Sequence, residues 1–321
     1  MSFVLTDDNY YSDGADMEYM SCSQFQGFME CEAKQLAKLQ GRWQDEEKEA
    51  FLVGRYFHSY FEGKEAYEKF CQKNFDKIFK TKEVTVKKAT KTTPAIKETV
   101  VTGKYAPFEM ADEMIKVAEN DPLIKQIIDM EGQNEISMTG YIGETKWRIR
   151  MDKYIPDMNW IVDYKTVANI WETSYNPVKQ VRQTFVEAYG YLFRAAVYSL
   201  IECQNRLEIT FDESFRQLKE GVLDLPNFIL VCISKQKHPD KEVVRLNHEQ
   251  EYIKEIEGLL PKLYRYNMIK AGRLLPKRCG VCDYCRATKV LDKIIPYYEL
   301  MPEFRGDKED DYAAESMAET F

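Results

Sequence analysis

The sequence lacks the long apolar runs that membrane proteins need. Its 321 positions contain no stretch of 18 or more uninterrupted apolar residues, so we expect no membrane-spanning helix. The acidic start, MSFVLTDDNYYSDGADMEYM, also lacks the basic-then-apolar order of a signal peptide. We therefore expect a cytoplasmic protein that begins with a flexible leader at residues 1–20.

The sequence also lacks an excess of basic residues. With 45 Lys and Arg against 53 Asp and Glu, its net charge is −8, which does not favour a general nucleic-acid coat protein, because phosphate binding requires Lys and Arg. The charge is uneven, however. Residues 301–321 are acidic and are expected to form a disordered tail, whereas residues 82–104 are rich in Lys and Thr and are expected to form an exposed loop. An acidic enzyme can still carry a basic groove, so DNA is not excluded as a partner.

The remaining composition supports a folded core, since hydrophobic residues make up 44% and aromatic residues 13% of the chain. Apolar residues recur at helical spacing in several segments, before and after a region of alternating apolar and polar residues at 135–167. Turn signals near Gly143 and at 156–159 divide this region into three strands of a meander. Further strands are expected at 227–236 and 242–247. This order predicts one α/β domain, residues 21–300, with a mixed sheet flanked by helices.

Two aspartates and a lysine lie on adjoining strands of the predicted meander. In the segment IVDYKT, Asp163 and Lys165 point to the same side because side chains alternate along a strand. Asp152 lies eleven residues earlier on the preceding strand. Neighbouring strands are about 5 Å apart, so the two carboxylates can converge on one cation. Oxygen ligands of this kind suit Mg²⁺, or Mn²⁺ in its place.

This set of residues supports phosphodiester hydrolysis. A bound metal ion polarises a phosphoryl oxygen and lowers the pKa of a bound water, and Lys165 can orient that water or neutralise developing charge. The alternative is a surface cross-strand pair of Asp and Lys, because the Asp-x-Lys tripeptide is common by chance. The strand context and the paired Asp152 favour the catalytic interpretation.

The order of motifs resembles the RecB-type PD-(D/E)XK nucleases. That family carries a GxxxH helix, an Asp, a (D/E)xK strand and a QxxxY helix, and over residues 21–291 this chain shows the first three of them in that order, at Gly54 to His58, at Asp152 and at 163–165. It is most similar to phage and prophage proteins with the exodeoxyribonuclease VIII (RecE-type) domain. The resemblance implies a restriction-endonuclease-like fold.

The resemblance also suggests roles for other residues. His58 would face the metal and help to coordinate it, and Gly54 would let its helix pass close to the sheet. Glu135, at the start of the first meander strand, is a further candidate ligand. In the last motif Arg194 stands where Gln is usual, and Arg194 and Tyr198 would contact the DNA backbone. The competing alignment places Gln183 and Glu187 there and fits less well, and an ordinary amphipathic helix is the third interpretation.

Three of the eight cysteines, Cys279, Cys282 and Cys285, form a CxxCxxC run. Iron–sulfur clusters and structural Zn²⁺ both require four ligands. Cys31 completes the set by resemblance to the lone early cysteine of iron–sulfur RecB-like nucleases, which would join the two ends of the domain. We expect a 4Fe-4S cluster, with Zn²⁺ or unligated thiols as alternatives. The other cysteines are scattered along the chain.

These features together predict a Mg²⁺-dependent DNA exonuclease. The resemblance implies 5′–3′ digestion of linear double-stranded ends, delivery of the exposed strand to a phage single-strand annealing protein, and a homo-oligomer. The alternatives are an iron–sulfur nuclease of CRISPR adaptation, a non-catalytic DNA-binding module with a nuclease fold, and a plain zinc-binding scaffold. Intact Asp152, Asp163 and Lys165 favour catalysis.

Overall fold

The computed structural model of the protein describes residues 3–46, 48–87, 96–176, 180–291 and 293–300. The chain divides into two compact units, Met1–Lys277 and Arg278–Phe321. The first unit contains the sheet and most of the helices. The predicted acidic tail at 301–321 lies outside the described residues.

A five-stranded mixed sheet forms the centre of the first unit, in the order β3-β4-β5-β8-β9. Its antiparallel meander comprises β3 (Gln133–Ile142), β4 (Thr145–Ile155) and β5 (Trp160–Val167). β8 (Asn227–Ser234) runs parallel to β5, and β9 (Lys241–Arg245) pairs antiparallel with β8. The predicted α/β class and the three-stranded meander are therefore confirmed.

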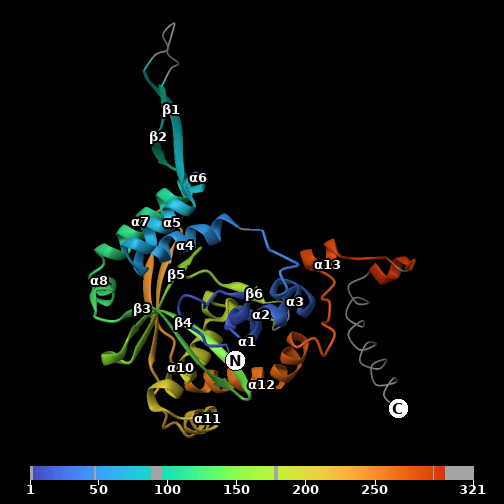
Figure 1. The fold of residues 1–321 in the computed structure, drawn as a ribbon. Helices are drawn as coiled ribbons and strands as arrows, with labels where there is room; N and C mark the ends of the chain where they lie inside the picture. The colour runs from blue at the N-terminus through green and yellow to red at the C-terminus, as the bar shows by residue number, and fades with distance from the viewer. Residues whose placement is uncertain (1–2, 47, 88–95, 177–179, 292, 301–321) are drawn as a thin grey trace, which may run out of the picture. The chain divides into compact units, whose positions relative to one another are not determined.

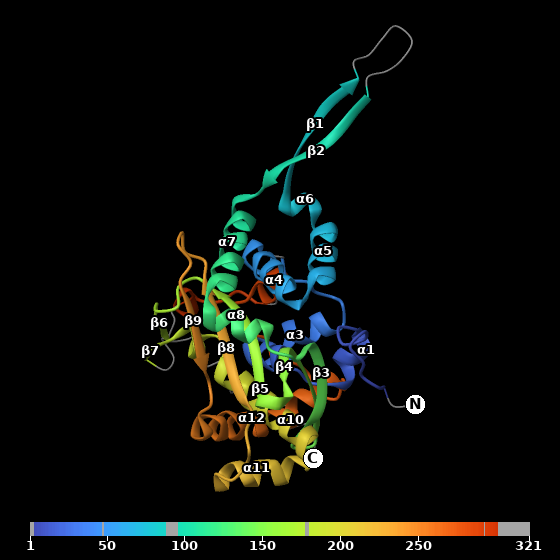
Figure 2. The same ribbon diagram turned by 90° about the vertical axis from the view of Figure 1, so that its left-hand side faces the viewer.

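Helices cover both faces of this sheet (Figure 2). On β8, Phe228, Leu230 and Cys232 belong to one hydrophobic core, and the alternating residues at 229, 231 and 233 belong to the other. The first core includes residues of α2 (Cys22–Glu30), α10 (Tyr191–Leu207), α11 (Phe211–Glu220) and α12 (Glu249–Lys270). The second includes residues of α4 (Glu49–Glu62), α7 (Ala106–Asn120) and α8 (Pro122–Asp129).

The N-terminal region is more structured than a loose leader. It contains α1 (Asp13–Glu18), buries Tyr10 and Ala15, and joins the sheet through a bridge between Met20 and Trp147. The segment that follows forms two helices, α2 and α3 (Glu32–Leu39). The break falls at Cys31, whose extended backbone (φ −164°, ψ 107°) interrupts the helical path and turns the chain.

The Lys/Thr-rich segment forms a long hairpin in its described part. After α5 (Lys64–Lys73) and α6 (Phe75–Ile78), β1 (Phe79–Lys87) pairs with β2 (Ile96–Lys104) and extends away from the sheet (Figure 1). The side chains at 81–85 and 98–102 are exposed. In its described part this segment, predicted as an exposed loop at 82–104, is a two-stranded hairpin, because alternating Thr and Val favour strands. The tip, 88–95, lies outside the described residues.

Short elements complete the two units. The first unit also contains η1 (Pro156–Met158), β6 (Ser174–Asn176), β7 (Val181–Gln183) and α9 (Phe185–Ala188). The second contains α13 (Asp283–Ala287) and η2 (Tyr297–Leu300). Among the described residues, no helix combines the length and the apolar character that crossing a membrane requires.

Candidate active site and thiol cluster

The candidate active site lies where β4 and β5 separate. Their ladder runs from the pair Ile155–Trp160 to the pair Lys153–Val162 and then stops. In the same register Asp152 and Asp163 would form the next pair. Instead, the backbone N–H of Tyr164 donates to Oδ2 of Asp152 at 2.8 Å. A side chain thus takes the place of a ladder bond, and β4 and β5 separate at the two aspartates.

Lys165 joins these two carboxylates. Its Nζ lies 2.6 Å from Oδ2 of Asp163 and 3.5 Å from Oδ2 of Asp152. Asp163 is only 2% exposed, so its charge is removed from water and depends on this partner. The three residues that the sequence places on adjoining strands therefore meet at one point.

His58 reaches the same point from α4. Its Nε2 lies 2.9 Å from Oδ2 of Asp152 and 3.5 Å from Oε1 of Glu135. Glu62, one turn further along α4, joins them, and His58, Glu62 and Glu135 each offer a ligand atom within 4.8 Å of the others. The sequence interpretation missed Glu62. Its position four residues after His58, on the same helical face, was the available signal.

Glu135 is held in an unusual backbone conformation. Its φ is +54°, in the left-handed region that non-glycine residues rarely adopt. Arg150 Nε lies 2.6 Å from Oε2, whereas Oε1 is buried and accepts no hydrogen bond from any residue that the structure describes. The register of β3 and β4 places Glu135 opposite Asp152. A strained residue with a buried, unsatisfied oxygen at this position fits a cation ligand.

The charges of the site shift one another's pKa values. Burial alone would lower the pKa of His58, but the negative charge of Asp152 raises it to about 9. Burial raises the pKa of the Asp163 carboxyl, and the charge of Lys165 offsets only part of that effect. For Asp152, the charges of Lys165 and His58 outweigh burial and hold the pKa of its carboxyl below its ordinary value. The site is a dense network of buried, mutually dependent charges.

Arg194 approaches from α10, on the opposite layer. Its Nη1 lies 3.7 Å from Oδ1 of Asp163, and its guanidinium stands 5.9 Å from the ring centroid of Tyr198. The Arg194 side chain is 28% exposed, so it can reach a ligand. Tyr198 is 7% exposed and belongs to the core. Arg194 is therefore the accessible member of the pair, and the buried Tyr198 ring lies beside its guanidinium.

Other positions that the sequence interpretation considered have local structural roles. Gln183 accepts a hydrogen bond from Asn176 at 2.8 Å, and Glu187 completes the capping box of α9. Gly54 lies on the side of α4 that faces the sheet, where an added Cβ would lie 3.5 Å from Oγ1 of Thr166. This is ordinary van der Waals contact, so the close approach does not require glycine.

The second unit contains three of the four predicted thiol ligands. Sγ of Cys279 lies 3.9 Å from Sγ of Cys285. The backbone N–H of Cys282 donates to Sγ of Cys279, and that of Cys285 donates to Sγ of Cys282, each at 3.4 Å. Backbone N–H groups that point at sulfur stabilise the thiolate form, which is the form that binds metals. The CxxCxxC run therefore forms a compact donor set.

Cys31 lies in the first unit, at the break between α2 and α3, and is 4% exposed. The chain that leads to the second unit is fixed beside it. The backbone N–H of Lys277 donates to Glu32 at 2.7 Å, and Lys277 accepts from Ala33 at 3.0 Å. Cys279 follows only two residues later. Cys31 and the three cysteines of the second unit are therefore the candidate ligands of one metal centre, and this set, comprising Cys31, Cys279, Cys282 and Cys285, is called the four-cysteine site.

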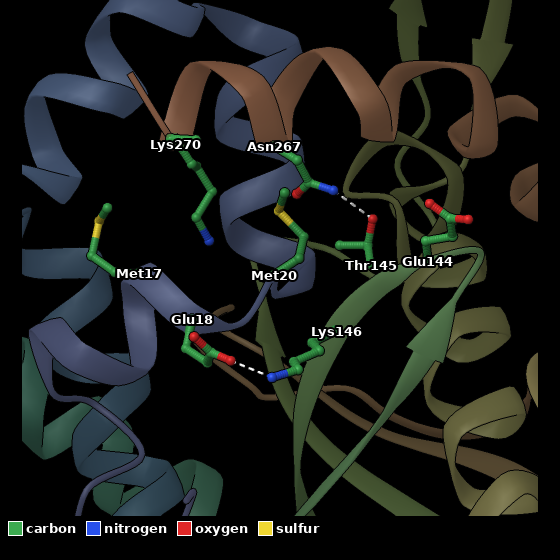
Figure 3. A pocket seen from close by; sticks show the side chains of 9 residues that line it. Met17, Glu18, Met20, Glu144, Thr145, Lys146, Asn267 and Lys270 are labelled. Carbon is green, nitrogen blue, oxygen red and sulfur yellow. Dashed lines mark hydrogen bonds and ion pairs between the residues drawn. The ribbon is translucent and has the colours of Figure 1, made fainter. Parts of the chain in front are cut away.

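A separate pocket of about 340 Å³ lies between α1, α12 and the turn from β3 to β4 (Figure 3). Lys270 projects into it and donates to the backbone oxygen of Tyr19 at 2.8 Å and to Oε1 of Gln24 at 3.1 Å. Burial lowers the pKa of Lys270 to about 8. None of the residues that line this pocket belongs to the carboxylate site or the four-cysteine site.

Comparisons with known proteins agree with this geometry. A crystal structure of a Eubacterium rectale protein, described as a candidate exonuclease, is 29% identical with a TM-score of 0.73, and the match covers 94% of this chain and 99% of that one. None of the curated proteins matches the chain. The model of the PDDEXK-like domain of unknown function (DUF3799) matches residues 21–288. The chain therefore belongs to this PDDEXK-like family, as the order of its motifs indicates.

Proposed function

We propose that this protein is a divalent-metal-dependent exonuclease that hydrolyses phosphodiester bonds at DNA ends. The observation that carries the proposal is the meeting of Asp152, Asp163 and Lys165 where β4 and β5 separate. Membership of a PDDEXK-like family and similarity to a candidate exonuclease support it. Burying two carboxylates and a lysine together costs desolvation free energy. A non-catalytic DNA-binding module would have no need of such an arrangement.

The donor set fits a hard cation such as Mg²⁺ or Mn²⁺. Asp152 and Asp163 would hold it, with His58, Glu62 or Glu135 beside them, and the buried, unsatisfied Oε1 of Glu135 is a ready ligand atom. When bound, the cation supplies Lewis-acid polarisation of the phosphate and a more acidic water. In the present arrangement, the positive charges of the Lys165 ammonium and the protonated His58 imidazole offset the negative charge of the carboxylates that would bind the cation.

The chain's own residues then have distinct tasks. Lys165, close to both carboxylates, can orient a water molecule and neutralise negative charge that develops on the phosphate. Arg194 presents a partly exposed guanidinium that can bind a phosphate oxygen, while Asp163 and Tyr198 keep it in place. His58 must lose its proton before it can bind a metal, because only the neutral imidazole is a ligand.

The four-cysteine site is proposed to hold a structural metal centre. Four thiols suit both Zn²⁺ and a 4Fe-4S cluster. The 3.9 Å separation of the Cys279 and Cys285 sulfur atoms favours a single tetrahedral ion, because a cluster inserts four iron atoms between the thiolates and holds them further apart. Zn²⁺ is thus the better match to this spacing, although the sequence motif favours iron–sulfur. Iron–sulfur protein would be brown with visible absorbance, and zinc protein would be colourless.

The resemblance to RecE-type proteins adds finer proposals. They are 5′–3′ digestion of double-stranded ends, transfer of the exposed strand to a single-strand annealing protein, and a homo-oligomeric assembly. A CRISPR-adaptation nuclease shares the core and the thiols and is the alternative. Duplexes labelled at the 5′ or the 3′ end of one strand separate the two polarities, because 5′–3′ digestion releases the 5′ label first.

One cleavage experiment tests the central proposal. Protein purified without oxygen is incubated with linear duplex DNA and Mg²⁺, alongside Asp163→Ala, Lys165→Ala and the surface control Lys254→Ala. Lys254 lies on α12 and its side chain is 68% exposed. The parent and the control should degrade DNA, and the two site variants should lose at least about a hundredfold in rate. Equal degradation by all four proteins would identify a contaminant and refute the site.

A further inference from the structure

An exposed tyrosine stands at the edge of the carboxylate site. Tyr11 precedes α1 and is 77% exposed, whereas its neighbour Tyr10 is 7% exposed, and the two rings meet edge to face with centroids 4.9 Å apart. The two residues thus have different roles. Tyr10 anchors the segment in the protein, and Tyr11 turns its ring to solvent. An exposed aromatic ring contributes little to the core, so the packing of the fold does not explain it.

The backbone that carries Tyr11 is fixed on the sheet. Oδ1 of Asp7 accepts from the backbone N–H of Ser137 on β3 at 3.1 Å, and the backbone oxygen of Asp7 accepts from Arg150 on β4 at 3.1 Å. The guanidinium of Arg148 lies 4.7 Å from the ring centroid of Tyr10. The segment therefore joins the same two strands that supply Glu135 and Asp152, and the backbone that carries Tyr11 is fixed before any ligand arrives.

A short series of contacts connects this ring with the site. The guanidinium of Arg150 lies 5.5 Å from the Tyr11 ring centroid, and Nε of Arg150 lies 2.6 Å from Oε2 of Glu135. Glu135 is in turn 3.5 Å from His58, which is 2.9 Å from Asp152. Tyr11 is thus four contacts from the candidate metal ligand Asp152, on the β3 side of the site.

We propose that Tyr11 is a nucleobase-binding residue, which stacks on an unpaired base of the DNA strand close to the phosphate that is cut. This inference rests on the proposed function. The Tyr11 residue is 77% exposed and its ring lies beside the Arg150 guanidinium, and every base offers a π-face that can stack on such a ring. Arg194 and Lys165 carry positive charges that suit the phosphates of the strand. An aromatic group at the edge of the site would add recognition of a base. A base that stacks on Tyr11 cannot remain in a duplex stack, so the end of the substrate must be splayed.

A double-mutant cycle tests this inference through binding, with no need for cleavage. The ligands are duplexes with three unpaired nucleotides at one end, either intact or with one abasic nucleotide at each of the three positions in turn. Affinity is measured by fluorescence anisotropy with Ca²⁺ in place of Mg²⁺, after gels confirm that the DNA stays intact. The proteins are the parent, Tyr11→Ala, Tyr11→Phe and Tyr264→Ala. Tyr264, on α12, is a matched control because it is 71% exposed and is not a member of the site.

The expected result is specific to one nucleotide. Tyr11→Ala should bind intact ends about fivefold to about 150-fold more weakly than the parent, the range found for loss of one base–aromatic stack. Tyr11→Phe and Tyr264→Ala should bind like the parent. At one position the abasic substitution should weaken the parent but leave Tyr11→Ala unchanged, because the two changes remove the same contact.

Two outcomes overturn the inference and leave the nuclease proposal intact. In the first, Tyr11→Ala binds every ligand like the parent. In the second, it loses the same factor for intact and abasic ends at all three positions, as a purely structural role would give. A parent protein that neither binds nor cleaves these duplexes with Mg²⁺ would instead refute the proposed function. If the parent in the same preparation cleaves DNA, a negative binding result therefore refutes the Tyr11 proposal and leaves the nuclease proposal intact.

Discussion

Replacing Lys165 with alanine should make the stability of this protein depend on divalent metal. In the parent, the ammonium of Lys165 lies 2.6 Å from Asp163 and 3.5 Å from Asp152. Its removal leaves both carboxylates without their shared cation, and Asp163 is 2% exposed. Loss of one partner of a buried ion pair costs about 3–5 kcal/mol in the free energy of unfolding. We expect a loss of this size in EDTA at neutral pH.

The size of this loss should depend on pH in a predictable direction. Burial already raises the pKa of Asp163, and without Lys165 it should rise further. A carboxyl whose pKa is higher in the folded than in the unfolded state binds more protons when folded. Its contribution therefore favours folding at low pH and is lost as the pH rises through the folded-state pKa. The stability difference between parent and Lys165→Ala should accordingly shrink as the pH falls toward 5.

Mg²⁺ should restore much of the lost stability, because it supplies the missing positive charge. A ligand present at a hundredfold its Kd stabilises the folded state by about 2.7 kcal/mol. The stabilisation should be larger for Lys165→Ala than for the parent, where the ammonium repels the cation. Urea unfolding of both proteins, with Mg²⁺ or EDTA at several pH values, measures these effects. If the variant is as stable as the parent in EDTA and indifferent to Mg²⁺, the two carboxylates do not form a cation site.

Three further predictions concern other parts of the molecule. Burial lowers the pKa of Lys270 to about 8, so between pH 8 and 10.5 the unfolded chain holds this proton and the folded protein does not. The free energy of unfolding, measured with urea, should therefore rise by about 2 kcal/mol over this range in the parent but not in Lys270→Met. Gly140→Ala should lower the free energy of unfolding by about 1–3 kcal/mol, because its Cβ would lie 2.9 Å from Oε1 of Gln204 and 3.2 Å from Ile201. Cys282→Ser should reduce bound zinc or iron about tenfold by elemental analysis, and unchanged content would exclude the four-cysteine site.

The parts of the site that the sequence predicted are those governed by local rules. Alternation along strands placed Asp163 and Lys165 on one side, and a short turn brought Asp152 next to them. The resemblance to a known family added His58, whose imidazole contacts Asp152. These inferences needed only the period of a strand and the order of motifs, both of which are visible in the sequence.

The features that the sequence did not predict depend on tertiary structure. No sequence pattern signals the left-handed backbone of Glu135, and the place of Glu62 beside it depends on how α4 lies against β3. The burial of Tyr198 depends on which face of α10 meets the sheet. The helix break at Cys31 carries no glycine or proline signal. Periodicity alone does not fix any of these arrangements.

The candidate site contains residues from both sides of the sheet, so its assembly depends on both hydrophobic cores. Arg194 comes from α10 in one hydrophobic core, and His58 comes from α4 in the other. The aspartates between them lie where the β4–β5 ladder stops, so the strands alone do not fix their positions. Both helices must therefore be packed before the charges can assemble. Substitutions that loosen either core should lower metal affinity and cleavage together, even when they lie far from the aspartates.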